Sequence, residues 1–518
     1  MNEVNGRGPV KLRKWASSKK NMIKKLIPYI LLGLISISLL IFMLTSWKFQ
    51  PAGDIIEYYG VTESLLSHGG INLTQEDYQN LVNTFNEGYF SDPRYFMAGR
   101  GAERFSAHFI GYSVLAVPTR ALLELIGSDP KKALGFTNLL IFSASLLFIM
   151  LKYLKNTAPK LILLLAAFTS PLIFFLTWPG PDLMVLSVLL ISLFAFWKKD
   201  FITAVILAIL ASWHSQPLIV MAALYGLYWI VAEARSNIYM NFLKETIRII
   251  TTGKTIAIVT ALTILAAIPY LYNLYFFSVL SPWSIFEDGW TKLNGFGIQN
   301  MSPWKLYEQL FDLNMGVFWY APLLVVLATI VLWKLKFDRR IQFLTFGMIL
   351  TAFAFQTNPA WHYGTAGFGP SRHAVFLIPF FIFLVVVGFQ KIPKNMEMGL
   401  FGLSLLLFQW YSVSMNGYFV PDFTRVLYHN DYAKYVLNNY PELYNPTPEI
   451  FIDRSLHSDP QEPRSASYEH NGFCKKAYIL SYDTDLIQKQ CGFVPSKVEN
   501  ELWNLPKERS LEGIYVNY

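Results

Sequence analysis

Residues 26–45 read LIPYILLGLISISLLIFMLT and contain no charged side chain. An apolar run of about 18 or more residues is long enough to cross roughly 30 Å of hydrocarbon as a helix. This run is longer than the apolar core of a signal peptide, and it lacks the small-residue cleavage site that would follow one. We therefore expect it to remain in the protein as the first membrane-spanning helix.

Similar apolar runs recur along most of the chain. Of the 518 residues, 53% are hydrophobic and only 15% are charged, whereas an average soluble protein carries about 25% charge. The composition argues against a water-soluble enzyme and predicts an all-α polytopic membrane protein with about eleven spans. The expected spans are 26–45, 135–151, 161–178, 183–197, 201–213, 217–232, 255–277, 315–333, 341–356, 374–390 and 398–416.

Positive charge is concentrated ahead of the first span. The chain has a net charge of +8, and residues 1–25 hold eight lysines and arginines against one glutamate. A basic tail beside an apolar span is typical of a cytoplasmic end that contacts anionic membrane lipids. This clustering explains the basic balance of the chain without a nucleic-acid partner.

The remaining basic clusters set the orientation of the spans. All of them lie on the cytoplasmic side only if residues 108–127 form an amphipathic helix on the outer surface instead of a further span. The chain then sits in the inner (cytoplasmic) membrane, with its amino terminus inside and the loop 47–134 outside. The basic clusters are Lys152/Lys155/Lys160, Lys198/Lys199, Arg235/Lys244/Arg248/Lys254, Lys334/Lys336/Arg339/Arg340 and Lys391/Lys394.

The chain divides into three parts: the basic tail 1–25, the membrane module 26–416 and an extracytoplasmic segment 417–518. Short apolar runs and proline-rich turns predict a small α+β or irregular cap for the last part. Cys474 and Cys491 are the only cysteines, and both fall in this segment. An oxidising compartment permits a disulfide between them, and two free thiols are the alternative.

Three acids are candidates for catalysis. Asp54 and Glu57 lie where the chain leaves the first span, and their spacing puts both on one face of a helix. Asp182 occurs in a very short outer loop between two apolar runs. Acids at membrane depth are costly and usually functional, although solvated charges in an interfacial loop remain the alternative. No cofactor is firmly implied, and a divalent metal bridging these acids has no ligand spacing to support it.

Basic and aromatic side chains are expected on the same outer face. Arginine binds phosphate well because its planar fork makes paired, charge-assisted hydrogen bonds. For any single residue, loop solubility or snorkelling is the alternative, but the set predicts an anion-binding cavity. The phosphate-binding candidates are Arg94, Arg100, Arg104, His108, His214 and Arg372. The candidates for contact with a sugar or an acceptor are Tyr58, Trp178, Trp361 and His362.

Five features occur in the order found in one enzyme family. They are residues 53–66 (GDIIEYYGVTESLL), 108–118 (HFIGYSVLAVP), Asp182, 316–322 (GVFWYAP) and 361–372 (WHYGTAGFGPSR). Over roughly residues 20–420 this pattern resembles the C superfamily of membrane-embedded glycosyltransferases (GT-C), which includes protein O-mannosyltransferases and lipid A aminoarabinose transferases. The resemblance implies that Asp54 is the catalytic base. Ser371, which separates Pro370 from Arg372, departs from the family pattern.

The expected function is inverting transfer of a sugar from a polyprenyl-phosphate donor to a hydroxyl group at the outer membrane face. The acceptor would be a glycan, a lipid or a protein of the cell envelope. No cytoplasmic loop is large enough for a nucleotide-binding domain, which favours a lipid-linked donor. Two alternatives stay open: a transporter or lipid flippase, which would also line a cavity with charges, and a non-catalytic envelope scaffold.

Overall fold

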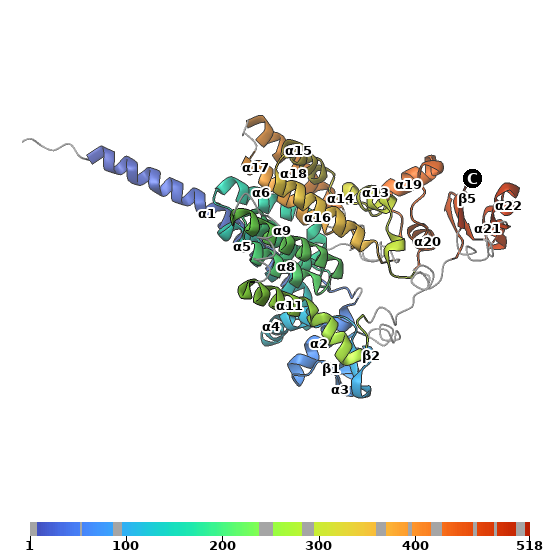
Figure 1. Ribbon diagram of the computed structural model, residues 1–518. Helices are drawn as coiled ribbons and strands as arrows, with labels where there is room; N and C mark the ends of the chain where they lie inside the picture. Colours follow the sequence, from blue (N-terminus) through green and yellow to red (C-terminus); the bar gives the residue numbers. More distant parts are fainter. Residues whose placement is uncertain are drawn as a thin grey trace, which may run out of the picture.

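The computed structural model describes residues 8–51, 54–85, 96–237, 252–281, 295–358, 369–391, 396–415, 427–458, 464–480, 484–503 and 513–518. This part of the chain is mostly helical and has two small three-stranded antiparallel sheets. In Figure 1 most of the helices gather in one body, from which the amino-terminal helix projects on one side and the carboxyl-terminal elements on the other. The predicted predominance of helix is confirmed.

Each expected span overlaps an apolar helix, although not always over its full length. Three segments of the described chain are long and apolar enough to cross a membrane: Lys24–Thr45, Pro130–Lys152 and Gly253–Phe277. The number of eleven spans stays a prediction, because several of the helices are shorter. The helices are α1 (Gly8–Thr45), α5 (Ala133–Lys152), α6 (Thr157–Phe168), α7 (Asp182–Trp197), α8 (Phe201–Ser212), α9 (Ile219–Asn237), α11 (Gly253–Phe277), α15 (Pro322–Lys334), α16 (Arg339–Phe355), α17 (Leu377–Lys391) and α18 (Met396–Met415).

One expected span, 161–178, is not a continuous helix. Helix α6 ends at Phe168, and a 3-10 turn follows at Pro171–Phe175. Pro171 cannot continue an α-helix, and the Ser170 hydroxyl accepts a hydrogen bond from the backbone amide of Leu172 (3.4 Å) to start the turn. Residues 166–181 are buried throughout, which is where non-helical backbone is tolerated in a membrane protein.

The first loop contains helices and a small sheet. Its elements are α2 (Ile55–Ser67), β1 (Asn72–Leu73), α3 (Gln75–Phe85), β2 (Phe96–Ala98), β3 (Arg104–Ser106) and α4 (Gly111–Leu125), with strand order β1-β3-β2. Helix α4 buries Tyr112 and Ala116 but exposes Leu122 and Leu125. The predicted helix within 108–127 is therefore confirmed, and its exposed face is apolar as contact with lipid requires.

Polar contacts fix this loop to the helical body. The Ser113 hydroxyl on α4 donates to the backbone oxygen of Tyr58 on α2 (2.9 Å). The Tyr112 hydroxyl donates to the backbone oxygen of Leu134 (2.9 Å) and to the Asn138 side chain on α5 (3.0 Å). Helices α2, α4 and α5 are thereby joined through buried hydrogen bonds.

Charged groups collect at two opposite ends of the bundle. We call the end that holds the basic helix termini the basic face, and the end at which α7 begins with Asp182 the carboxylate face. Asp182 pairs there with Arg372, which precedes α17. On the basic face the contacts are Lys152–Asp200 (2.6 Å), Lys391–Asp338 (2.6 Å) and Arg340 to the backbone oxygen of Trp197 (2.5 Å).

The carboxyl-terminal segment is an α+β unit, in agreement with the first of the two predicted alternatives. It contains α19 (Asp431–Asn439), α20 (Pro448–Leu456), β4 (Ala466–His470), β5 (Phe473–Leu480), α21 (Thr484–Cys491), α22 (Ser496–Trp503) and β6 (Gly513–Asn517). The strands form an antiparallel sheet in the order β4-β5-β6. A disulfide between Cys474 and Cys491 links β5 to α21.

A buried polar cluster connects this unit to the membrane module. Between α13 (Pro303–Phe311) and α14 (Val317–Tyr320), the Asp312 carboxylate accepts a hydrogen bond from the Tyr444 hydroxyl (2.9 Å). The Asn430 side-chain amide donates to the backbone oxygen of Leu313 (2.6 Å). The two parts are thus held by directional bonds as well as by apolar contact.

The expected orientation can be tested with single cysteines in a Cys474→Ser/Cys491→Ser background. Glu76 on α3 and Lys336 between α15 and α16 are both exposed. We expect Glu76→Cys to react with a membrane-impermeant maleimide in intact cells and Lys336→Cys to react only after permeabilisation. Equal labelling of the two variants in intact cells would contradict the orientation.

Candidate active site on the carboxylate face

Two of the predicted acids occupy different environments at the start of α2. Asp54 is the residue before the helix, and its side chain makes no cap hydrogen bond. The Asp54 side chain is 30% exposed, whereas that of Glu57, one turn later, is 4% exposed. Asp54 is therefore reachable by a substrate, and Glu57 is not.

Glu57 is enclosed by hydrogen-bond donors. Its Oε2 atom accepts from the Ser106 hydroxyl (2.6 Å), from the backbone amide of His108 (3.1 Å) and from the Nδ1 atom of His108 (2.9 Å). The other ring nitrogen of His108, Nε2, lies 3.6 Å from Oδ2 of Asp54. His108 is consequently held between a buried acid and an accessible one.

The charge of His108 follows from this position. Burial opposes the charged imidazolium, but the carboxylates of Glu57 and Asp54 outweigh burial and raise the pKa of His108 to about 9. Arg372 nearby acts in the opposite direction and is weaker than the acids. At neutral pH His108 is therefore a cation.

Arg372 provides a second cation in the cluster. Its Nε atom donates to Oδ1 of Asp182 (3.0 Å), and its Nη1 atom lies 3.9 Å from Oδ2 of Asp54. The guanidinium carbon is 6.0 Å from the ring centre of Trp178, within the range of a cation–π contact. The structure therefore brings together Asp54, Glu57, His108, Asp182, Arg372 and Trp178 from distant parts of the sequence.

A buried asparagine positions the segment that carries Trp178 and Asp182. The Asn138 side-chain amide donates to the backbone oxygens of Trp178 (2.8 Å) and Phe175 (3.2 Å). Sequence reasoning missed Asn138 and Ser106. A lone amide in the otherwise apolar run 135–151 is the signal that could have identified Asn138, because polar groups at membrane depth need partners.

The turn at Gly180 allows Trp178 and Asp182 to lie close to the backbone. A Cβ atom at Gly180 would lie 2.7 Å from Nε1 of Trp178 and 3.1 Å from Oδ2 of Asp182. Oδ2 of Asp182 is buried, and no hydrogen-bond partner is found for it within the described ranges.

Two predicted aromatic or histidine contacts do not face an open site. Tyr58 is only 2% exposed, and its ring packs on those of His108 and Tyr112, so it is not available to an incoming acceptor. Nε2 of His214 accepts a hydrogen bond from the backbone amide of Tyr112 (3.1 Å). Burial, assisted by the charge of His108, lowers the pKa of His214 to about 3. His214 is therefore neutral and cannot supply positive charge to a phosphate.

Several predicted arginines and aromatics lie outside the cluster. Arg100 and Arg104 are exposed and lie over the rings of Tyr275 (4.9 Å) and Tyr78 (5.5 Å), and neither makes an ion pair with the described carboxylates of the cluster. The predicted residues Arg94, Trp361 and His362 lie outside the described residues.

The described part of the chain contains no group of three or more His, Cys, Asp or Glu residues arranged to hold a metal ion. The divalent-metal alternative stays a prediction. Neither a known protein family nor a curated protein matches the sequence.

The charge of His108 predicts a pH dependence of stability. Because the pKa of His108 is raised from 6.5 to about 9, its contribution to the free energy of unfolding is fully present below about pH 6.5. This contribution, on the order of 3 kcal/mol at most, is lost as the pH rises through about 9. Thermal unfolding of the detergent-solubilised protein between pH 6 and pH 10 measures it.

A matched pair of variants isolates the effect. His108→Gln should be less stable than the wild type at pH 6. Its stability should then fall much less than that of the wild type as the pH rises to 10. His68→Gln removes a histidine that pairs with Asp77 in the same loop (2.9 Å). Its stability should fall between pH 6 and pH 10 as that of the wild type does. An unchanged pH profile in His108→Gln would refute the assignment.

Proposed function

We propose that the protein is an inverting glycosyltransferase that uses a polyprenyl-phosphate sugar donor at the extracytoplasmic face of the inner membrane. The observation that supports this best is the accessible carboxylate of Asp54, which lies next to two cations just after the first apolar helix. The acceptor would be a hydroxyl group of an envelope glycan, lipid or protein. The resemblance to the GT-C motifs supports the same assignment.

Asp54 has the setting of a general base. In the proposed reaction the acceptor oxygen forms a bond with the anomeric carbon, and the bond from that carbon to the phosphate oxygen breaks. The bonding electron pair leaves with the polyprenyl phosphate, and Asp54 takes the acceptor proton. Help from a general base is commonly worth about 10²–10⁴-fold in rate.

The two cations are suited to the leaving phosphate. His108 and Arg372 are each anchored by an acid at hydrogen-bond distance, 2.9 Å to the buried Glu57 and 3.0 Å to Asp182, whose side chain is 13% exposed. Their distances to Asp54 are longer, 3.6 and 3.9 Å, and exceed normal hydrogen-bond lengths. A phosphate could therefore replace the contacts with Asp54 while both cations keep their anchors. Glu57 and Asp182 then act as positioning residues.

The surroundings of the cluster suit a lipid-linked donor. Helix α4, which begins three residues after His108, exposes the apolar side chains of Val114, Leu122 and Leu125. This surface would contact the acyl chains of the membrane and the prenyl chain of a donor. The phosphate at the polar end of that chain would then meet the cations at the interface.

Replacement of the proposed base gives the direct test. Asp54→Asn should reduce sugar transfer at least 100-fold, because the amide cannot accept the proton of the acceptor. Membranes containing the protein would be incubated with polyprenyl phosphates that carry hexoses or pentoses. Mass spectrometry of the released polyprenyl phosphate follows turnover even when the acceptor comes from the membrane itself.

The matched control is Glu76→Gln, which removes one exposed acid from the same loop and should retain turnover. Near-normal release of polyprenyl phosphate by Asp54→Asn would reject the proposed role. Movement of intact donor across a vesicle bilayer, without cleavage, would instead favour the transporter. An unaltered cellular phenotype for Asp54→Asn would favour the scaffold.

A further inference from the structure

A second charged cavity lies on the basic face. It has a volume of about 590 Å³ and is bounded by the start of α8, the end of α9 and the start of α16. Helix α7 has 16 residues, which corresponds to about 24 Å, and it separates this cavity from Asp182 at its other end. The cavity is therefore distinct from the candidate active site.

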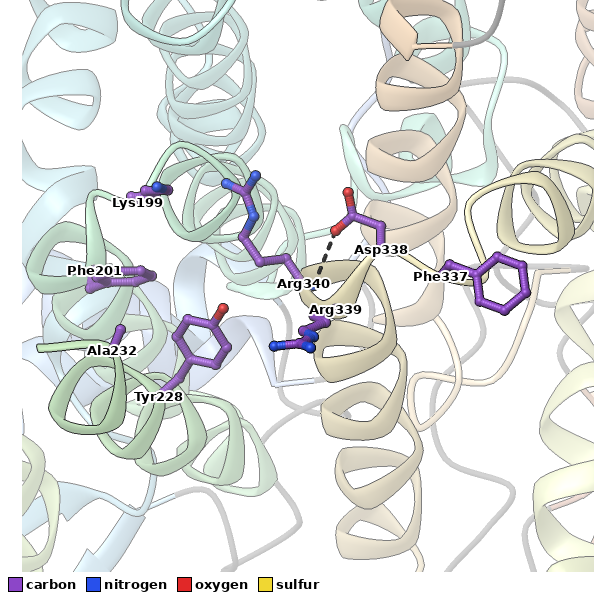
Figure 2. Close-up of a pocket in the computed structure, with 8 residues that line it drawn as sticks. All are labelled: Lys199, Phe201, Tyr228, Ala232, Phe337, Asp338, Arg339 and Arg340. Atoms are coloured by element: carbon purple, nitrogen blue, oxygen red, sulfur yellow. Dashed lines mark hydrogen bonds between the residues drawn. The ribbon is translucent and has the colours of Figure 1, made fainter. Parts of the chain in front are cut away.

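Cations from separate elements face this space. Figure 2 shows Lys199 and Phe201 on one side and Arg339 and Arg340 on the other, with the guanidinium of Arg339 directed toward Tyr228. Lys199 and Arg339 are exposed, and no ion pair or hydrogen bond from the described residues involves either of their side chains. These two cations are thus available to a ligand.

Among the residues whose side chains the structure describes, two acids at or beside the cavity are already engaged. The Asp338 carboxylate accepts from the backbone amide of Arg340 (3.1 Å) and pairs with the amine of Lys391 (2.6 Å). Asp200 pairs with Lys152 (2.6 Å) and accepts from the Tyr153 hydroxyl (3.1 Å). The positive charge of Lys199, Arg339 and Arg340 is consequently not balanced by these acids.

The cations next to the cavity affect the pKa of Lys198. Burial lowers the pKa of Lys198, and the neighbouring charges of Lys155, Arg340 and Lys391 lower it further. An anion bound in the cavity would reduce this repulsion.

Arg340 is held in a fixed position for such a ligand. Its Nη1 atom donates to the backbone oxygen of Trp197 (2.5 Å), and its guanidinium carbon lies 4.5 Å from the Trp197 ring centre. A guanidinium has five N–H donors, so several remain after this bond. Fixing the side chain in advance lowers the entropy that binding would cost.

The surroundings indicate an amphipathic ligand. Phe337, at the edge of the cavity, is 83% exposed. Trp333 and Ile202, which are close in sequence to lining residues, are also exposed. Exposed aromatic and apolar side chains beside arginine and lysine are typical of the interface between membrane and water. A soluble anion would gain nothing from this apolar surface.

We propose that this cavity binds the phosphate headgroup of an anionic membrane lipid, with Lys199, Arg339 and Arg340 as its donors. Arginine and lysine next to a membrane surface gain affinity from anionic lipid, and the guanidinium fork fits phosphate oxygens. The apolar side chains at the edge contact the acyl chains. This proposal is independent of the catalytic role of Asp54.

The test compares two double variants of the full-length protein. Lys199→Gln/Arg339→Gln removes the two cations whose side chains have no ion pair with the described residues. Lys24→Gln/Lys25→Gln removes the same charge from two exposed lysines of α1 that do not line the cavity, beside the start of α6, where the Thr157 hydroxyl donates to the backbone oxygen of Lys24 (3.4 Å). Phosphatidylglycerol is titrated against each protein in detergent, and the bound lipid is counted by native mass spectrometry, with phosphatidylcholine as the uncharged reference.

We expect the cavity variant to bind phosphatidylglycerol about 30-fold more weakly than the wild type, since each cation near the surface contributes about fivefold. The control variant should change less than threefold, and phosphatidylcholine should not respond. Equal weakening in both double variants, or none in the cavity variant, would overturn the proposal. Inorganic phosphate that competes with the lipid at equal affinity would overturn the assignment to a lipid.

Folding is checked by size-exclusion chromatography and thermal unfolding of every variant. Should the double variant be misfolded, Lys199→Gln alone supplies the measurement, because this residue lies in the turn between α7 and α8 and its side chain is exposed. We expect about fivefold weaker binding of phosphatidylglycerol for the single variant. Wild-type affinity in that variant would contradict the proposal.

Discussion

The arrangement of the carboxylate face depends on the cost of burying Glu57. A buried carboxylate is tolerated only when it is paired and hydrogen-bonded, and Glu57 obtains its donors from Ser106 and His108. To supply them, β3 and the start of α4 must pack on the first turn of α2. That packing places His108 next to Asp54, and the same turn leaves Asp54 partly exposed. The accessible acid is therefore positioned by the inaccessible one.

Helix α7 connects the two charged ends of the molecule. Its interior residues are buried and almost entirely apolar, so it needs no polar face and can be short where protein surrounds it. Asp182 at its start and Lys198 just after its end lie in different clusters. The apolar length between them keeps the cluster around Asp182 apart from the basic cavity.

The sequence predicted the helical segments well, because apolar composition is local information. Four of its site candidates, Asp54, His108, Asp182 and Arg372, lie together in the structure, although Asp182 and Arg372 are 190 residues apart. The sequence could not show that His214 is neutral or that Tyr58 is enclosed, since both depend on burial and on the direction of hydrogen bonds from other helices. The break after Phe168 was missed because the following residues remain apolar, and hydropathy does not respond to Ser170 and Pro171. Asn138 went unnoticed for a related reason: its side-chain amide donates to backbone oxygens, which the sequence does not reveal.

The mixture of charges on the carboxylate face is suited to a reaction that separates charge. Among the described residues the cluster holds three acids and two cations. Because the acids would repel an anion, this arrangement does not suit a site that only binds one. Transfer of a sugar makes the anomeric carbon more positive while the departing phosphate gains negative charge. Fixed groups of both signs can stabilise such a transition state more than the ground state, because their positions are set before the reaction begins. Asp54 would face the developing positive charge and the incoming hydroxyl, and His108 and Arg372 would face the phosphate. The acids Glu57 and Asp182 then matter chiefly because they hold the two cations away from Asp54.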